Sequence, residues 1–170
     1  MTSDLPQPES PLWKESTRRG GVGAIRWIPI SAALSDGLEI GIDSDGHWVY
    51  DTAEGVARVG DHGRYVHLLP ALKIRRVEAL KAISDALAAK SLSEDIANSF
   101  PFNAIIVEGL RARGYWSGLA IANLEQEGTL APEFEAPLKE LVTNIDQTTQ
   151  KVRHAAQRLL HKLRTRNDNK

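Results

Sequence analysis

The side chains best suited to chemistry in this sequence include five histidines, and their spacing argues against a shared metal site. His154 and His161 lie seven residues apart, which places them on one line of a helix at a separation of roughly 10 Å. A helix that binds one metal ion through two histidines places them four residues apart. His62 and His67 have opposite parity along a strand, so they point to opposite faces. We therefore predict that the histidines hold no metal.

Asp43, Asp45 and Asp51 partly match the spacing of a calcium-binding loop. An EF-hand loop needs an oxygen ligand at position 5, glycine at position 6 and a bidentate glutamate at position 12. Counted from Asp43, Glu54 falls at position 12, but Gly46 falls at position 4. Asp45 and Gly46 suit a hairpin turn better, because glycine tolerates positive φ and aspartate can bond its own backbone. We predict neither a metal nor a cofactor.

Signals for a nucleophile or for acid–base catalysis are also weak. Ser117 lies in the stretch Gly-Tyr-Trp-Ser-Gly, which is not the G-x-S-x-G elbow of a hydrolase and falls inside a predicted helix. The carboxylates come in pairs two residues apart, a spacing that a helix turns to different faces. These pairs are Glu125 with Glu127 and Glu133 with Glu135. We therefore predict no catalytic residue and interpret the protein as a non-enzyme.

The composition is that of an ordinary globular chain. Its 170 residues are 42% hydrophobic and 25% charged, which suits one compact domain or two small ones that share a core. A formal net charge of −1 gives no overall attraction to nucleic acid or anionic lipid. Cysteine is absent, which excludes disulfides, thiol nucleophiles and cysteine zinc sites. We find no signal-peptide pattern and no apolar run of about 20 residues, so we expect a cytoplasmic protein without membrane contact.

The first part of the chain has the pattern of a small β-sheet. Residues 1–19 are polar and proline-rich, and we predict a flexible N-terminal segment there. Residues 24–30 predict one strand, and residues 38–42 and 47–50 predict a hairpin around Asp45 and Gly46. A second hairpin is expected from 56–59 and 64–69, closed by Pro70. Residues 20–70 should thus form a small antiparallel β subdomain.

From residue 72 the apolar residues recur with the period of a helix. We predict six helices, over 72–89, 93–100, 102–113, 115–127, from 132, and 147–166. The short loops between the last four force antiparallel neighbours. The predicted fold class is α+β: the β subdomain, then a C-terminal bundle of short antiparallel helices over 71–166 that resembles HEAT-like hairpins and shares one core with the sheet. No repeat with a fixed period is visible.

The last predicted helix is basic, whereas the helices before it are acidic. Residues 147–170 carry seven Lys or Arg and one acid, and residues 92–146 carry nine acids and three basic residues. The apolar stripe of the last helix should pack on the preceding helix. Its members are Val152, Ala155, Ala156, Leu159, Leu160 and Leu163. The acidic side chains then either pair with the basic helix inside the protein or form a surface that binds a basic partner.

The C-terminal half also resembles small bacterial immunity proteins that are encoded beside polymorphic toxins. The similar residues cover about 115–160 and follow a helical packing pattern. They are Tyr115, Trp116, Leu119, Ala120, Leu124, Gln150, Arg153, His154, Ala156 and Leu160. The resemblance implies a protein that binds a toxin domain tightly and blocks it, without chemistry of its own.

We therefore predict a non-enzymatic protein-binding module, with an immunity protein as its specific version. The predicted contact residues lie on the acidic helices and are Glu108, Glu125, Glu127, Glu133, Glu135 and Trp116. One alternative is a regulatory protein that contacts nucleic acid through residues 147–170, which is disfavoured because that segment holds no aromatic residue. The other alternative is a small enzyme whose site combines His62, His67 and a carboxylate such as Glu78.

Overall fold

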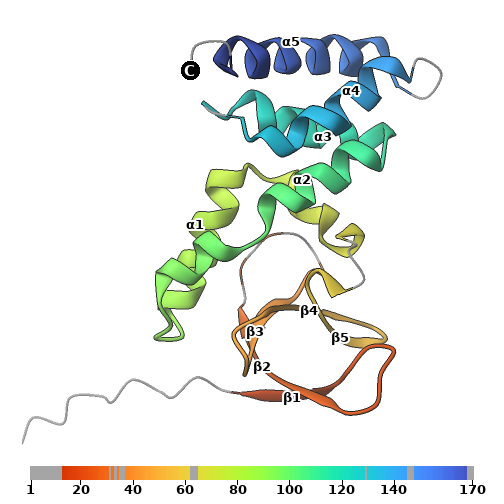
Figure 1. The fold of residues 1–170 in the computed structure, drawn as a ribbon. Coiled ribbons are helices and arrows are strands. Elements are labelled where there is room, and N and C mark those ends of the chain that lie inside the picture. The colour runs from red at the N-terminus through yellow and green to blue at the C-terminus, as the bar shows by residue number, and fades with distance from the viewer. Residues whose placement is uncertain are drawn as a thin grey trace, which may run out of the picture. The chain divides into compact units, whose positions relative to one another are not determined.

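The protein has the predicted α+β architecture, an antiparallel sheet followed by helices (Figure 1). This computed structural model describes residues 13–30, 32, 34, 37–61, 65–128, 130–144 and 148–167. The backbone forms two compact units. The first contains the described residues of Met1–Gly63 together with Val77–Phe100, and the second those of Arg64–Arg76 and Pro101–Lys170. The division thus differs from the boundary expected near residue 70, and the single shared core stays a prediction.

The first unit is built on five antiparallel strands that neighbour one another in chain order. They are β1 (Lys14–Thr17), β2 (Ala24–Ile30), β3 (Ile40–Asp43), β4 (Trp48–Thr52) and β5 (Gly55–Arg58). Ile42 lies opposite Ile28 on one side and Trp48 on the other, so apolar side chains stack across three strands. The predicted strand over 24–30 and the hairpin over 38–50 are confirmed.

Strand β1 corrects the predicted flexible segment, of which residues 1–12 lie outside the described residues. Lys14–Thr17 is almost wholly exposed and has no apolar residue, so hydrophobic alternation could not reveal it. The strand is held instead by its backbone pairing with β2 and by polar contacts. One of these is the Trp27 indole, which donates to Ser16 Oγ at 3.0 Å.

The sheet curls until its first and last strands meet. Arg18 forms a parallel bridge with Val56, and the Arg19 amide donates to the Val56 carbonyl at 2.8 Å. Gly55 has a φ of +113°, and a Cβ added there would lie 2.5 Å from the Thr17 carbonyl oxygen, so this contact requires glycine. The sheet therefore forms a small, partly closed barrel. Its core includes the buried residues Ile25, Trp27, Val49 and Val56.

The strand predicted over 64–69 is wrong. Val66–Lys73 forms a 3-10 helix, η2, and residues 62–64 lie outside the described residues. In η2 the adjacent residues Leu68 and Leu69 are both buried, which a strand with one buried face does not allow. The helix expected from residue 72 begins later, as α1 (Arg76–Ala88), and the short helix expected over 93–100 is the 3-10 helix η3 (Glu94–Ser99).

Helix η3 is attached to the sheet of the first unit through Trp48 of β4. The Trp48 ring meets the Phe100 ring edge-to-face, with centroids 5.1 Å apart. The Trp48 indole also donates to Ser99 Oγ at 3.0 Å. Strand β4 is thereby joined to the C-terminal end of η3.

The second unit, called here the helical unit, contains η2 and the C-terminal helices. Those helices are α2 (Phe102–Arg111), α3 (Gly114–Glu125), η4 (Pro132–Phe134), α4 (Glu135–Thr143) and α5 (Gln150–Asn167). Helix α2 packs on α3, and α4 packs on α5, as two helical hairpins should. None of the helices that the structure describes is long and apolar enough to cross a membrane.

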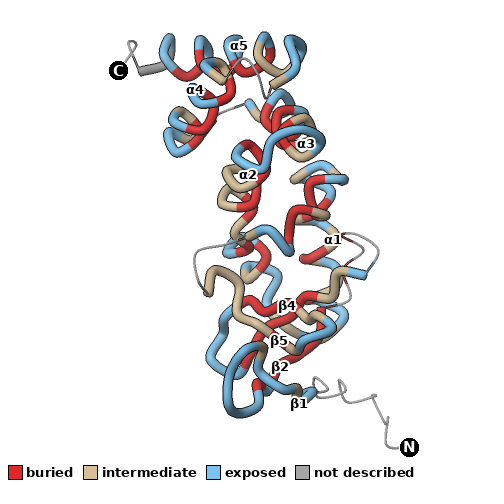
Figure 2. The backbone as a smooth tube through the Cα atoms, turned by 90° about the vertical axis from the view of Figure 1, so that its right-hand side faces the viewer, coloured by how far each residue is buried: buried red, intermediate tan, exposed pale blue. Residues whose placement is uncertain are grey.

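The predicted stripe of α5 forms its buried face, directed toward α3 and α4 (Figure 2). Five of its six members are buried and Val152 is half-buried. The expected partners Leu138 and Leu141 are buried, Val142 is half-buried, and Ile145 lies outside the described residues. Helix α5 is therefore a packed part of the core of the helical unit.

Candidate interaction site on the helical unit

Helix α5 neutralises part of the acidic surface on which the predicted contact residues lie. Arg158 of α5 lies 2.7 Å from the Glu125 carboxylate. Lys162 donates to the main-chain oxygen of Glu127 at 2.6 Å, and Arg76 pairs with the Glu127 carboxylate at 2.9 Å. Two basic side chains of α5 are thus engaged inside the unit. The internal match expected from the sequence is present at these residues.

The other predicted acidic contact residues differ in their surroundings. Glu133 is exposed and accepts a hydrogen bond from the Asn103 amide at 2.8 Å. Glu135 pairs with Lys139 one turn later at 2.6 Å, and this hydrogen bond lowers the pKa of the Glu135 carboxyl. Glu108 is half-buried on α2. A basic partner would have to compete with the cation or amide already beside most of these carboxylates, and their role as contacts stays a prediction.

A buried amide organises the polar contacts of Arg76. Asn123 of α3 is buried; its Oδ1 accepts from the Arg76 backbone amide at 2.9 Å, and its Nδ2 donates to the Leu72 carbonyl at 3.1 Å. The Arg76 guanidinium adds a 2.6 Å hydrogen bond to Asn103 Oδ1 on α2. Since buried polar groups need such partners, these contacts explain why an amide side chain lies inside the core. We assign them a structural role.

The connection from α2 to α3 presents a different surface, which we call the α2–α3 corner and define by Arg111, Arg113, Tyr115 and Trp116. Tyr115 is 64% exposed. Its ring meets that of Trp116 at a centroid distance of 5.1 Å and an interplanar angle of 69°, and Trp116 is half-buried. An aromatic side chain this exposed adds little to the core, so its position calls for an explanation outside the core.

The backbone at the α2–α3 corner is strained. Arg113 has φ +60° and ψ 178°, a region that glycine adopts freely and that costs other residues about 1–3 kcal/mol. Gly114 follows with φ +55°. Arg111 and Arg113 are exposed, and neither forms a salt bridge in the part of the chain that the structure describes. The sequence pointed to Trp116, but not to the arginines beside it.

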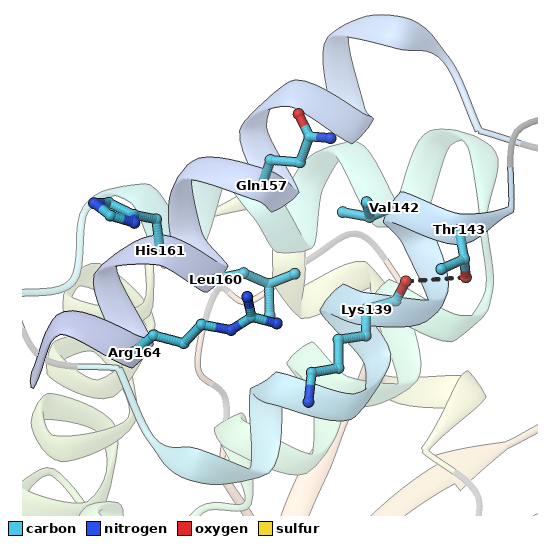
Figure 3. Close-up of a pocket in the computed structure, with 7 residues that line it drawn as sticks. All are labelled: Lys139, Val142, Thr143, Gln157, Leu160, His161 and Arg164. Atoms are coloured by element: carbon cyan, nitrogen blue, oxygen red, sulfur yellow. Dashed lines mark hydrogen bonds between the residues drawn. The ribbon is translucent and has the colours of Figure 1, made fainter. Parts of the chain in front are cut away.

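A shallow hollow of about 290 Å³ lies between α4 and α5 (Figure 3). Its lining combines the apolar side chains Val142 and Leu160 with five polar ones, Lys139, Thr143, Gln157, His161 and Arg164. Figure 3 shows Arg164 extending toward α4 across Leu160, while His161 points away from α4. All five polar lining residues are exposed. Because catalysis is favoured where water is excluded, the hollow suits a weak surface contact better than a reaction site.

The described histidines other than His47 lie on α5 and η2. His154 and His161 are exposed on α5 at the expected seven-residue spacing. His67 is exposed on η2 in the helical unit, Glu78 is exposed on α1 in the first unit, and His62 lies outside the described residues. The proposed combination of His62, His67 and Glu78 therefore stays a prediction.

One group in the first unit has donor atoms close enough for a metal ion. The side chains of Asp43, Asp45 and His47 offer ligand atoms that all lie within 4.8 Å of one another. However, the Arg58 guanidinium already pairs with both carboxylates, and its Nε lies 2.5 Å from Asp43 Oδ2. A cation at this position would have to displace Arg58. The arrangement therefore fits an internal ion pair that holds the β3–β4 turn.

Comparison of the chain with known proteins adds no information about its function. No family model, no curated protein and no solved structure matches the chain. Of the surfaces described, the α2–α3 corner combines exposed aromatic area, a strained backbone and two arginines that form no salt bridge with another described residue. We therefore treat it as the candidate functional site.

Proposed function

We propose that this protein is a non-enzymatic protein-binding module that docks its partner through the α2–α3 corner. The observation that carries the proposal is Tyr115, which is 64% exposed and packs edge-to-face against Trp116. Tyrosine, tryptophan and arginine dominate the binding energy of protein interfaces, and the corner holds all three. Trp116 is also one of the contact residues predicted from the sequence.

The close packing of α2 on α3 supports this role. Gly109 of α2 is buried, and a Cβ added there would lie 2.5 Å from Leu72 Cδ1 and 3.2 Å from Ala120 Cβ of α3. Helices α2 and α3 therefore approach each other closely where Gly109 meets Ala120 and the Trp116 carbonyl. A surface that is already ordered loses less conformational entropy on binding.

The specific version of the proposal is an immunity protein that blocks a toxin domain by binding it. It is supported by the resemblance of residues 115–160, which includes Tyr115 and Trp116. Such a protein needs no reaction of its own. Its partner would be the product of a neighbouring gene.

The test is to purify the chain with each adjacent gene product and to measure binding by calorimetry. We expect Tyr115→Ala to weaken the complex at least tenfold, a loss of about 1.4 kcal/mol. Trp13→Ala is the matched control, because Trp13 is another exposed aromatic residue, in the first unit. A complex that Tyr115→Ala leaves unchanged would remove the corner from the proposal, and no complex with any neighbour would remove the immunity version.

A further inference from the structure

We infer that the partner segment received by the α2–α3 corner is acidic, with carboxylates that pair with Arg111 and Arg113. This inference rests on the proposed function and names the chemistry of the partner. Both arginines come shortly before the aromatic pair along the chain. An acidic segment that also carries apolar side chains would thus match both parts of the surface.

The charges of the helical unit favour an acidic partner segment. Several other basic side chains of the helical unit have acceptors there: Arg76 pairs with Glu127, Arg158 with Glu125 and Lys139 with Glu135. Arg111 and Arg113 form no such pair among the described residues, so their guanidinium groups are free to bind a carboxylate. Arginine presents a planar set of donors that fits both oxygens of a carboxylate.

The backbone of Arg113 also indicates that its side chain binds a ligand. Its conformation is one that glycine adopts without strain, and the neighbouring residue is a glycine. An arginine held in this conformation lowers the stability of the fold, and strained residues of this kind cluster at binding sites. The strain is explained if the side chain of Arg113 is needed for a ligand.

A protein segment fits the corner better than nucleic acid does. Binding to nucleic acid depends on neutralising several phosphates, whereas the corner offers two cations on a chain with a formal net charge of −1. The two rings meet edge-to-face, and such a pair is a poor platform for successive stacked bases.

The experiment uses the full chain labelled with ¹⁵N and three acetylated twelve-residue peptides. All three peptides have two central leucines, and the flanking residues are glutamate in one, lysine in the second and glutamine in the third. We expect the glutamate peptide to shift the Trp116 indole and Arg113 amide signals until saturation. Because two charge pairs are involved, the glutamine peptide should bind at least tenfold more weakly.

Two variants and a matched control assign the effect to the arginines. Arg111→Gln and Arg113→Gly should each weaken binding of the glutamate peptide about fivefold, the effect of one exposed charge pair. Glycine at position 113 suits the existing backbone, so this variant should keep its fold. Arg158→Gln removes an arginine of the same unit that is already paired with Glu125, and it should leave binding unchanged.

The inference is overturned if the glutamate peptide binds no tighter than the glutamine peptide. It is also overturned if Arg158→Gln costs the glutamate peptide as much affinity as Arg113→Gly, or if a twelve-nucleotide single strand of DNA or RNA binds the corner more tightly than that peptide. If the protein partner is lost with Tyr115→Ala but retained with Arg111→Gln and Arg113→Gly, the acidic chemistry is wrong and the proposed function stands.

Discussion

Replacement of Asp43 by asparagine tests whether the ion pair at the β3–β4 turn stabilises the sheet. Asp43 is 2% exposed, and its Oδ1 accepts from the backbone amides of Asp45 and His47 at 2.9 Å each. Its Oδ2 accepts from Arg58 Nε at 2.5 Å. Asparagine keeps the shape of the side chain but places an amide donor against one of these groups.

The magnitude follows from the contacts that are lost. One hydrogen bond between charged groups is replaced by a donor facing a donor, and hydrogen bonds of this kind contribute about 1.5–3 kcal/mol. Breaking a fully buried ion pair costs about 3–5 kcal/mol, but Arg58 remains partly exposed and keeps its pair with Asp45. We therefore expect Asp43→Asn to lower the free energy of unfolding by about 2–3 kcal/mol at pH 7.

The cost should also depend on pH. Burial alone raises the pKa of Asp43, but the hydrogen bonds from the His47 amide, Arg58 and the Asp45 amide outweigh it and hold the pKa below its ordinary value of 3.8. A carboxyl whose pKa is lowered by folding stabilises the fold above its unfolded pKa and loses that contribution as the pH falls through its folded pKa. Asparagine does not titrate, so the difference between the two proteins should shrink below pH 4.

Urea unfolding at pH 7 and pH 3, followed by tryptophan fluorescence, measures the effect. A Trp116→Phe background leaves the remaining tryptophans in the first unit, two of them buried in its sheet. Asp85→Asn is the control, because Asp85 is exposed and its salt-bridge partner among the described residues is Lys81, one turn away. A cost for Asp43→Asn below about 0.5 kcal/mol at pH 7, or the same cost at pH 3, would refute the reasoning.

Three further substitutions test the helical unit. Gly109→Ala should destabilise it by about 1 kcal/mol, because the added Cβ would lie 2.5 Å from Leu72 and the cost of overpacking exceeds the gain in helix propensity. An unchanged or higher midpoint of thermal unfolding would contradict this expectation. Asn123→Ala should cost about 2 kcal/mol by leaving buried backbone groups without partners, which urea unfolding measures. Arg113→Gly should stabilise the protein by about 1 kcal/mol, because the relief of backbone strain exceeds the conformational freedom that glycine adds to the unfolded chain. Calorimetry measures this change, and a lower midpoint of thermal unfolding would show that Arg113 is not strained.

Local patterns predicted the elements that bury one face. In the stripe of α5 and in the hairpin over 38–50, apolar residues recur at the spacing of the buried face, so the sequence predicts both elements. Both predictions are confirmed. Strand β1 was missed because Lys14–Thr17 is held by backbone pairing and has no apolar face. Helix η2 differs from the predicted strand because Val66–Leu69 has residue types that suit either structure.

The candidate site was only partly predictable because its properties depend on contacts between distant residues. The sequence composition indicates an acidic segment and a basic helix. It does not predict that Arg158 pairs with Glu125 or that Arg76 pairs with Glu127. That Arg111 and Arg113 form no such pair among the described residues depends on the same long-range contacts. The positive φ of Arg113 had no signal in the sequence apart from the following glycine.

The division of the chain into two units has a consequence for how the protein is made and cut. The chain passes from one unit to the other at three points, after residues 63, 76 and 100. The ribosome must therefore synthesise the chain as far as Phe100 before the first unit is complete, although the last strand of that unit's sheet ends at Arg58. For the same reason, a single protease cut between 64 and 76 separates neither unit as a whole from the other. Each unit can be obtained intact only as two pieces of chain or with its ends newly joined.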